Sequence, residues 1–206
     1  MTIANDPLEL EAVNVMLRAI REEEAASLED AEFAPVVARA IKVLARTNRA
    51  LQSSGFPCNT SVRTLTLDSN SEAPAPANCL QLKSTDPYKN YRLSQNKVYD
   101  VDNDTFTLTT APEVSCVLLL DFADMPMEFR EWAIESATRK FVADERGDSS
   151  GNSGNQSTFE GISQAKLNFE RWIIRNSSPN INNTLRQDIL VDRSYPTVGT
   201  RYRRYV

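Results

Sequence analysis

The spacing of apolar residues changes twice along this chain, and that change constrains the fold more than any other feature. In residues 1–59 and 123–177 apolar residues recur three and four positions apart, which is typical of helices that bury one face. In residues 60–122 apolar and polar residues alternate or form short apolar runs, which is typical of strands. We therefore expect an α+β fold, in which a four-helix bundle carries an inserted antiparallel β module.

Two helices are predicted in residues 1–59. Asp6-Pro7-Leu8-Glu9 has the residue types of a capping box, with proline at the first helical position. The stripe that follows consists of Leu10, Val13, Leu17 and Ile20. The second helix is bounded by Pro35 and Gly55, since proline favours helix starts and glycine favours helix ends. Its shared face consists of Val37, Ile41, Leu44, Asn48 and Leu51.

Two more helices are predicted in residues 123–177. Pro126 opens the third, and its buried side is expected to hold Phe129, Trp132, Ala133, Ser136, Ala137, Lys140 and Phe141. Ser157-Thr158-Phe159-Glu160 has the pattern of a second capping box and is expected to start the fourth helix. The apolar face of that helix is Ile162, Phe169, Trp172 and Ile173.

The β segment shows a hairpin pattern and one apolar run. Residues 97–100 and 105–108 flank Val101-Asp102-Asn103-Asp104, whose Asp and Asn residues suit a hairpin turn. Residues 114–120 form the apolar run, which suits a strand buried on both faces. Leu65 and Leu67, like Leu80 and Leu82, alternate with polar neighbours.

Two segments are expected to lie outside the core. Residues 147–157 are rich in Gly, Ser and Asn, which predicts a mobile loop between the third and fourth helices. Residues 178–206 keep no helical or strand period, which predicts an extended arm. Because Tyr and Arg are enriched at binding hot spots, we interpret the end of this arm as a partner-docking site. Its residues are Tyr195, Arg201, Tyr202, Arg203, Arg204 and Tyr205. A solvated terminus and a nucleic-acid contact remain the alternatives for this arm.

Residue types that carry chemistry are scarce. The chain of 206 residues has no histidine, and its three cysteines, Cys58, Cys79 and Cys116, are far apart and form no CxxC pair. We therefore expect no metal site, no cofactor and three small buried hydrophobes. Asp100, Asp102 and Asp104 alternate as in calcium loops but lack the glycine and glutamate of an EF-hand, so we interpret them as turn residues. Glu22-Glu23-Glu24 is interpreted as a solvated helix end.

Charge is unevenly distributed in a chain whose net charge is −5. Residues 1–32 hold nine acidic residues and two arginines, a balance of −7, whereas residues 184–206 hold five arginines and two acids, a balance of +3. Neighbouring copies with an acidic front and a basic tail would attract each other. No secretory signal precedes the first helix and no apolar run has the length of a membrane span, so we expect the chain to be made in the reducing cytoplasm.

Four blocks in order resemble the tail tubular protein A family, the tail adaptors of T7-like short-tailed phages. They are residues 10–20, Gln52-Ser53-Ser54-Gly55-Phe56-Pro57-Cys58-Asn59, Asn96-Lys97-Val98-Tyr99-Asp100 with Asp104-Thr105-Phe106, and residues 121–126 continued through 139–141. The likeness covers roughly residues 8–175. Phe56 and Cys58 stand where the family pattern has Trp and Phe.

This resemblance implies a non-enzymatic virion component, assembled in the host cytoplasm. Family members form a dodecameric ring that joins the portal protein to the tail nozzle (tubular protein B) and helps to attach tail fibres. DNA passes through the lumen only as cargo. The residues by themselves leave two other classes open, a DNA-binding protein that uses the basic arm and a virion-associated glycan hydrolase that uses paired carboxylates.

Overall fold

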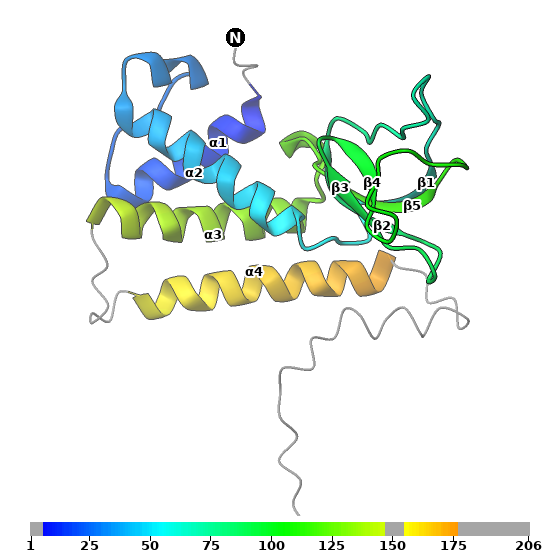
Figure 1. Cartoon of the computed structure of the whole chain (residues 1–206). Helices are drawn as coiled ribbons and strands as arrows, with labels where there is room; N and C mark the ends of the chain where they lie inside the picture. Colours follow the sequence, from blue (N-terminus) through cyan, green and yellow to red (C-terminus); the bar gives the residue numbers. More distant parts are fainter. Residues whose placement is uncertain (1–5, 147–154, 177–206) are drawn as a thin grey trace, which may run out of the picture.

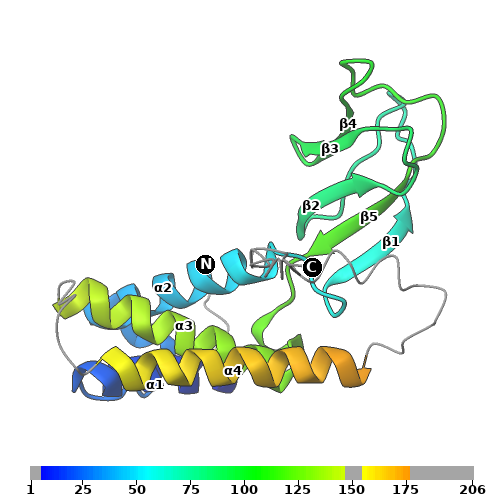
Figure 2. The same ribbon diagram turned by 90° about the horizontal axis from the view of Figure 1, so that it is seen from below.

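The computed structural model describes residues 6–146 and 155–176, and its helices and antiparallel sheets confirm the α+β class (Figure 1). The helices are α1 (Pro7–Ile20), α2 (Pro35–Gln52), α3 (Met127–Arg146) and α4 (Asn155–Asn176), with short 3₁₀ helices η1 (Leu28–Glu32) and η2 (Phe122–Asp124). The strands are β1 (Thr60–Thr64), β2 (Cys79–Ser84), β3 (Tyr91–Ser94), β4 (Lys97–Asp100) and β5 (Glu113–Leu118). We call the helices the helical body and residues 60–118 the β module, which projects beside the helical body (Figures 1 and 2).

Helix α3 holds the helical body together. It packs against α1, α2 and α4, whereas α4 packs chiefly against α3. Phe129, Ala133, Ala137 and Phe141 of α3 are fully buried, as predicted. The prediction was wrong for Lys140, which is exposed, because four-residue spacing carries the buried line through residue 141 and leaves the ammonium group in water. None of the helices in the described part of the chain is long and apolar enough to cross a membrane.

The sequence patterns that predicted the starts of α1 and α4 had different outcomes. Asp6 caps α1 by accepting a hydrogen bond from the Leu8 amide at 2.9 Å, and Pro7 is the first helical residue. Helix α4 begins at Asn155, so the predicted start at residues 157–160 was wrong, and so was the loop prediction for residues 155–157. No glycine or proline separates Asn155 from Glu160, so nothing in the backbone stops the helix from starting earlier. The rest of the predicted loop, residues 147–154, lies outside the described residues.

The β module consists of a three-stranded sheet in the order β1-β5-β2 and a separate β3-β4 hairpin. The prediction that residues 97–100 pair with residues 105–108 was wrong, because β4 pairs with β3 and only one bridge joins Asp100 to Thr105. The turn of the real hairpin is Gln95-Asn96, with φ of 49° and 58°. Two successive left-handed residues match the twist of paired strands, and this turn therefore sets the register.

The core of the β module is built on one face of β5. Val114, Cys116 and Leu118 are buried, whereas Ser115 and Val117 are half-buried, so the prediction of a strand buried on both faces was wrong. In β2, a bulge between Cys79 and Gln81 turns Cys79 inward and leaves Leu80 half-buried. All three cysteines are free thiols, and Cys79 and Cys116 are buried as expected while Cys58 is half-buried. Burial raises the pKa of Cys79 to about 11.

Two buried amides join the helical body to the β module, whose hydrophobic cores are separate. The side chain of Gln52, at the end of α2, donates to the Leu120 carbonyl at 3.0 Å and accepts from the Leu120 amide at 2.7 Å. The Asn59 side chain donates to the Gln52 carbonyl at 2.9 Å and to the Leu118 carbonyl at 3.0 Å. These bonds tie the segment that leaves the helical body to the segment that returns, because Leu118 and Leu120 lie on the returning segment.

Gly55 and Phe56 complete this junction. Gly55 has φ of +75°, and a Cβ atom there would lie 3.0 Å from Cγ2 of Val117. Phe56 turns back into the helical body, where its ring makes edge contacts with Phe129 at 5.4 Å and Phe169 at 5.0 Å between ring centroids. The chain therefore reverses sharply at a glycine while the next side chain anchors it in the helical core.

The first prediction concerns Gln52. Gln52→Ala would leave the Leu120 amide without its acceptor in a buried place, so we expect the free energy of unfolding to fall by about 2–4 kcal/mol. Urea unfolding followed by circular dichroism measures this change. Gln164→Ala is the matched control, because the Gln164 side chain is exposed and its amide donates to the side chain of half-buried Asn168, and we expect a change below about 0.5 kcal/mol. Equal effects of both variants would contradict the role given to Gln52.

The second prediction compares two glycines. Gly55→Ala should lower the free energy of unfolding by about 1–2 kcal/mol or more, because an L residue is strained at this φ and its Cβ would press on Val117. Gly161→Ala on α4 should leave stability unchanged or raise it by up to about 1 kcal/mol, because alanine favours helix and only the flexible end of Glu135 is near. Thermal melts of both variants test this opposite sign, and a destabilised Gly161→Ala variant would argue against it.

Candidate assembly surfaces

The predicted docking arm lies beyond the part of the chain that the structure describes. Residues 178–206, with Tyr195, Arg201, Tyr202, Arg203, Arg204 and Tyr205, fall outside the described residues, and their role stays a prediction. Candidate surfaces for assembly must therefore be sought on the helical body and the β module.

The acidic front forms part of the surface of the helical body. Arg18 pairs with Glu24 at 2.7 Å and with Glu11 at 3.0 Å, and all three side chains are about half exposed. Glu22 and Glu23 are exposed after the end of α1, which fits the interpretation of a solvated helix end. Most of the acidic excess of this segment thus faces solvent, where it is available to a basic partner.

The first of the alternating aspartates, Asp100, closes a turn. The Asp100 carboxylate accepts hydrogen bonds from the Asn103 side-chain amide at 2.9 Å and from the backbone amides of Asp102 and Asn103 at 3.0 and 3.2 Å. These bonds, led by that from the Asn103 side chain, lower the pKa of Asp100. Within residues 6–146 and 155–176 no group of three Asp, Glu, Cys or His side chains could hold a metal ion. Both oxygens of the Asp100 carboxylate are used by the turn.

The two tryptophans belong to an aromatic cluster in the helical body. The Trp132 and Phe169 rings stack with centroids 5.8 Å apart, and the Phe169 and Trp172 rings stack at 6.0 Å. Phe129 and Phe56 complete this cluster, in which Phe129 and Phe169 are fully buried. Its contacts are those of a packed core that fixes α4 on α3.

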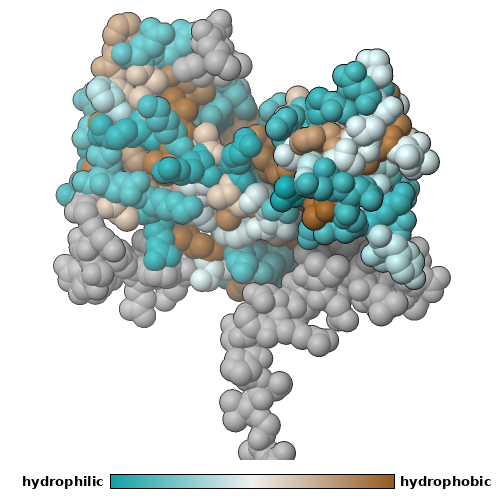
Figure 3. All heavy atoms as spheres, viewed as in Figure 1, coloured by the Kyte–Doolittle hydropathy of each residue, from teal (hydrophilic) through white to brown (hydrophobic). Residues whose placement is uncertain are grey.

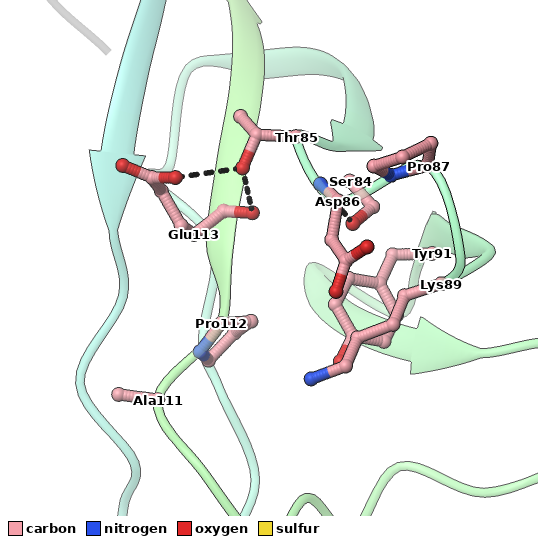
Figure 4. A pocket seen from close by; sticks show the side chains of 9 residues that line it. All are labelled: Ser84, Thr85, Asp86, Pro87, Lys89, Tyr91, Ala111, Pro112 and Glu113. Atoms are coloured by element: carbon pink, nitrogen blue, oxygen red, sulfur yellow. Dashed lines mark hydrogen bonds between the residues drawn. The ribbon is translucent and has the colours of Figure 1, made fainter.

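An open hollow of about 570 Å³ lies in the β module between the β2–β3 loop and the start of β5 (Figure 4). Thr85 donates its hydroxyl to the Glu113 side chain at 2.8 Å and contacts the Glu113 carbonyl at 3.1 Å. Asp86, Lys89 and Tyr91 line the opposite side. The hollow is polar and shallow, and it lacks the apolar enclosure that small-molecule sites have.

Several large apolar side chains are exposed, and sequence reasoning missed them. Phe33 is 87% exposed between η1 and α2, Tyr88 is 92% exposed on the β2–β3 loop, and Ile174 is 73% exposed at the end of α4. The adjacent pair Ile173-Ile174 did carry a signal, because Ile173 continues the four-residue spacing from Phe169, whereas Ile174 lies about 100° further round the helix and off that line. Figure 3 shows the helical body and β module as two lobes with a notch between them, and most of the visible outer surface is hydrophilic.

Comparison with known proteins identifies the family. The model of the tail tubular protein family matches residues 10–184, which is most of the chain. The chain is also 28% identical over 142 residues to the tail tubular protein A of Klebsiella phage KP34, an alignment that covers 68% of this chain and 75% of that protein. This chain belongs to the tail tubular protein family, and it is a structural component of a phage tail and not an enzyme.

Proposed function

We propose that this protein is a tail adaptor whose copies form a ring between the portal protein and the tail nozzle. The observation that carries the proposal is the pairing of two bodies with separate cores across a junction of buried amides. An adaptor must hold its neighbours in the ring and also present a second surface to the next ring along the tail axis. A helical body with a fixed, projecting β module suits both tasks.

The details of this role are those that the family resemblance implies. In the proposal the helical body acts as a four-helix bundle that makes the side-to-side contacts of a dodecameric ring. The β module contacts the nozzle formed by tubular protein B, and tail fibres attach at the same level. Assembly takes place in the host cytoplasm, and DNA passes through the lumen as cargo. The net charge of −5 supports this passage, because an acidic lining repels phosphates and lets DNA slide.

The basic arm has a place in this proposal as a docking element. Tyr195, Arg201, Tyr202, Arg203, Arg204 and Tyr205 would bury aromatic rings and pair guanidinium groups with carboxylates of the portal, the nozzle or a neighbouring copy. The acidic surface around Glu22 and Glu23 supports the last of these choices, since it offers an oppositely charged site on every copy.

Electron microscopy of the purified protein, alone and mixed with portal rings, tests the adaptor role. We expect a ring of copies either in solution or on the portal, because ring contacts require several subunits side by side. A chain that stays monomeric and does not bind the portal would exclude the proposal.

Truncation tests the arm separately. A chain that ends at Ser194 should keep its melting temperature, because residues 195–206 show no helical or strand period and the proposal assigns them to docking, and it should bind portal, nozzle or neighbouring copies more weakly. Sedimentation of the mixed components measures this binding. A matched full-length variant carries Arg201→Ala, Arg203→Ala and Arg204→Ala. It shows whether weaker binding comes from the loss of positive charge or from the loss of the residues themselves. Normal assembly of both variants would rule out a docking role for the arm.

A further inference from the structure

Two exposed apolar corners of the helical body carry opposite charge. The acidic corner consists of Phe33, which is 87% exposed just after η1, with the exposed residues Glu29 and Glu32 of η1. The basic corner consists of Ile174 and Leu167, 73% and 44% exposed on α4, with Arg171 and Arg175 exposed beside them. Leu167 and Ile174 are seven residues apart and therefore lie on one face of the helix, two turns from each other.

The charges of these two corners have no opposite partner in the described part of the chain. Other exposed charges of the helical body do form ion pairs, such as Arg39 with Glu145 at 2.6 Å and Arg18 with Glu24 at 2.7 Å. Glu29, Glu32, Arg171 and Arg175 form none with any described residue. Each corner thus combines an exposed apolar side chain with charges that an oppositely charged surface would pair.

The two corners lie at opposite ends of the helical body. The connection from η1 to α2 stands at the end where α3 finishes, and the end of α4 stands at the other end, below the β module (Figures 1 and 2). One copy cannot bring its own corners together. Two copies can, and because the two surfaces differ, the contact is head-to-tail and leaves a free corner at each end.

We propose that the acidic corner of one copy docks on the basic corner of the next copy, so that Phe33 packs against Ile174 and Leu167 while Glu29 and Glu32 pair with Arg171 and Arg175. This inference rests on the proposed ring and names its side-to-side contact. The repeat of such a contact closes a ring when the rotation between copies fits. The arm of the same chain is the poorer occupant for the basic corner, because residues 184–206 carry a balance of +3 and the arginines would repel them.

Charge reversal on the full chain tests this contact. Arg171→Glu with Arg175→Glu would place four acids against each other, so we expect ring assembly on portal rings to fall by at least about tenfold. Adding Glu29→Arg and Glu32→Arg to the same chain reverses both corners and should restore assembly. Lys42→Glu with Arg46→Glu is the control, because these exposed cations have the same spacing on α2 and lie outside both corners. Electron microscopy counts the rings, and thermal melting checks that each variant is folded.

The outcomes separate this inference from the adaptor role. If the wild-type chain forms rings and the Arg171→Glu, Arg175→Glu variant forms them equally well, the corner contact is wrong. The proposal of an adaptor ring is then unaffected. The corner contact is also wrong if reversing Glu29 and Glu32 does not restore assembly, which would point to the portal or the arm as the partner of the basic corner. If the wild-type chain forms no ring, the adaptor proposal fails and the corner contact fails with it.

A disulfide test locates the contact directly. Phe33→Cys and Ile174→Cys in one chain should give a ladder of covalent oligomers when rings are oxidised, whereas a mixture of the two single variants should give dimers only. Phe33→Cys with Met127→Cys is the matched control, because Met127 is also exposed but lies outside the proposed contact. A ladder from the control pair, or none from the Phe33 and Ile174 pair, would overturn the assignment.

Discussion

The buried amides of Gln52 and Asn59 are the contacts on which the arrangement of this protein depends. The polypeptide crosses between its two cores at this place, outward after α2 and back before α3. Each crossing leaves backbone groups that neither a helix nor a sheet pairs, and a buried unpaired group costs about 1–3 kcal/mol. The Gln52 side chain bonds the Leu120 backbone, and the Asn59 side chain bonds the Gln52 and Leu118 carbonyls. Leu118 and Leu120 are thereby bound to the end of α2 and to the loop that follows it.

The helical body and the β module are packed independently on the two sides of this junction. The aromatic cluster of Phe56, Phe129, Trp132, Phe169 and Trp172 begins at the same loop and holds α4 on α3. This cluster positions α4 on the helical body, whereas η1 is positioned by its packing against α2. Glu29, Glu32, Arg171 and Arg175 on these two elements form no ion pair within the described residues. The β module needs no contribution from this cluster, since its own core is built on β5. In the proposed ring, side-to-side and axial contacts would therefore be carried by different surfaces of one subunit.

The sequence predicted the features whose signals are local. Asp6-Pro7 and Pro35 marked the starts of α1 and α2, and Gly55 marked the sharp turn after α2, because each residue type has a direct effect on the backbone. Pairing of strands could not be predicted from the same kind of signal. Asp102 and Asn103 looked like a hairpin turn, yet Gln95-Asn96 closes the hairpin, since register depends on which strands meet in space. Lys140 was misplaced because an apolar stripe does not say how wide the covered face is.

Predicting the candidate surfaces was harder for a related reason. Exposure of Phe33 and Ile174 depends on where η1 and α4 lie on the helical body, and apolar residues in a pattern are first assigned to a core. The acidic front was visible as a run of charges, but only the structure separates Glu24, which pairs with Arg18, from Glu29 and Glu32, which have no such partner among the described residues. The docking role of the arm was predicted from its Tyr and Arg content alone, and residues 178–206 lie outside the described ranges.

Amide hydrogen exchange at Leu120, measured by NMR on the full chain, tests most directly whether the junction is fixed. The Leu120 N–H donates to a side chain, Gln52 Oε1, and belongs to no helix or strand ladder. A fixed junction predicts that this amide exchanges within about tenfold of the Leu118 amide, which donates to the Asn59 carbonyl at 2.8 Å, because both open only when the junction breaks. Exchange of Leu120 at the rate of an unprotected amide, with Leu118 still protected, would show a hinge between the two bodies and contradict this account.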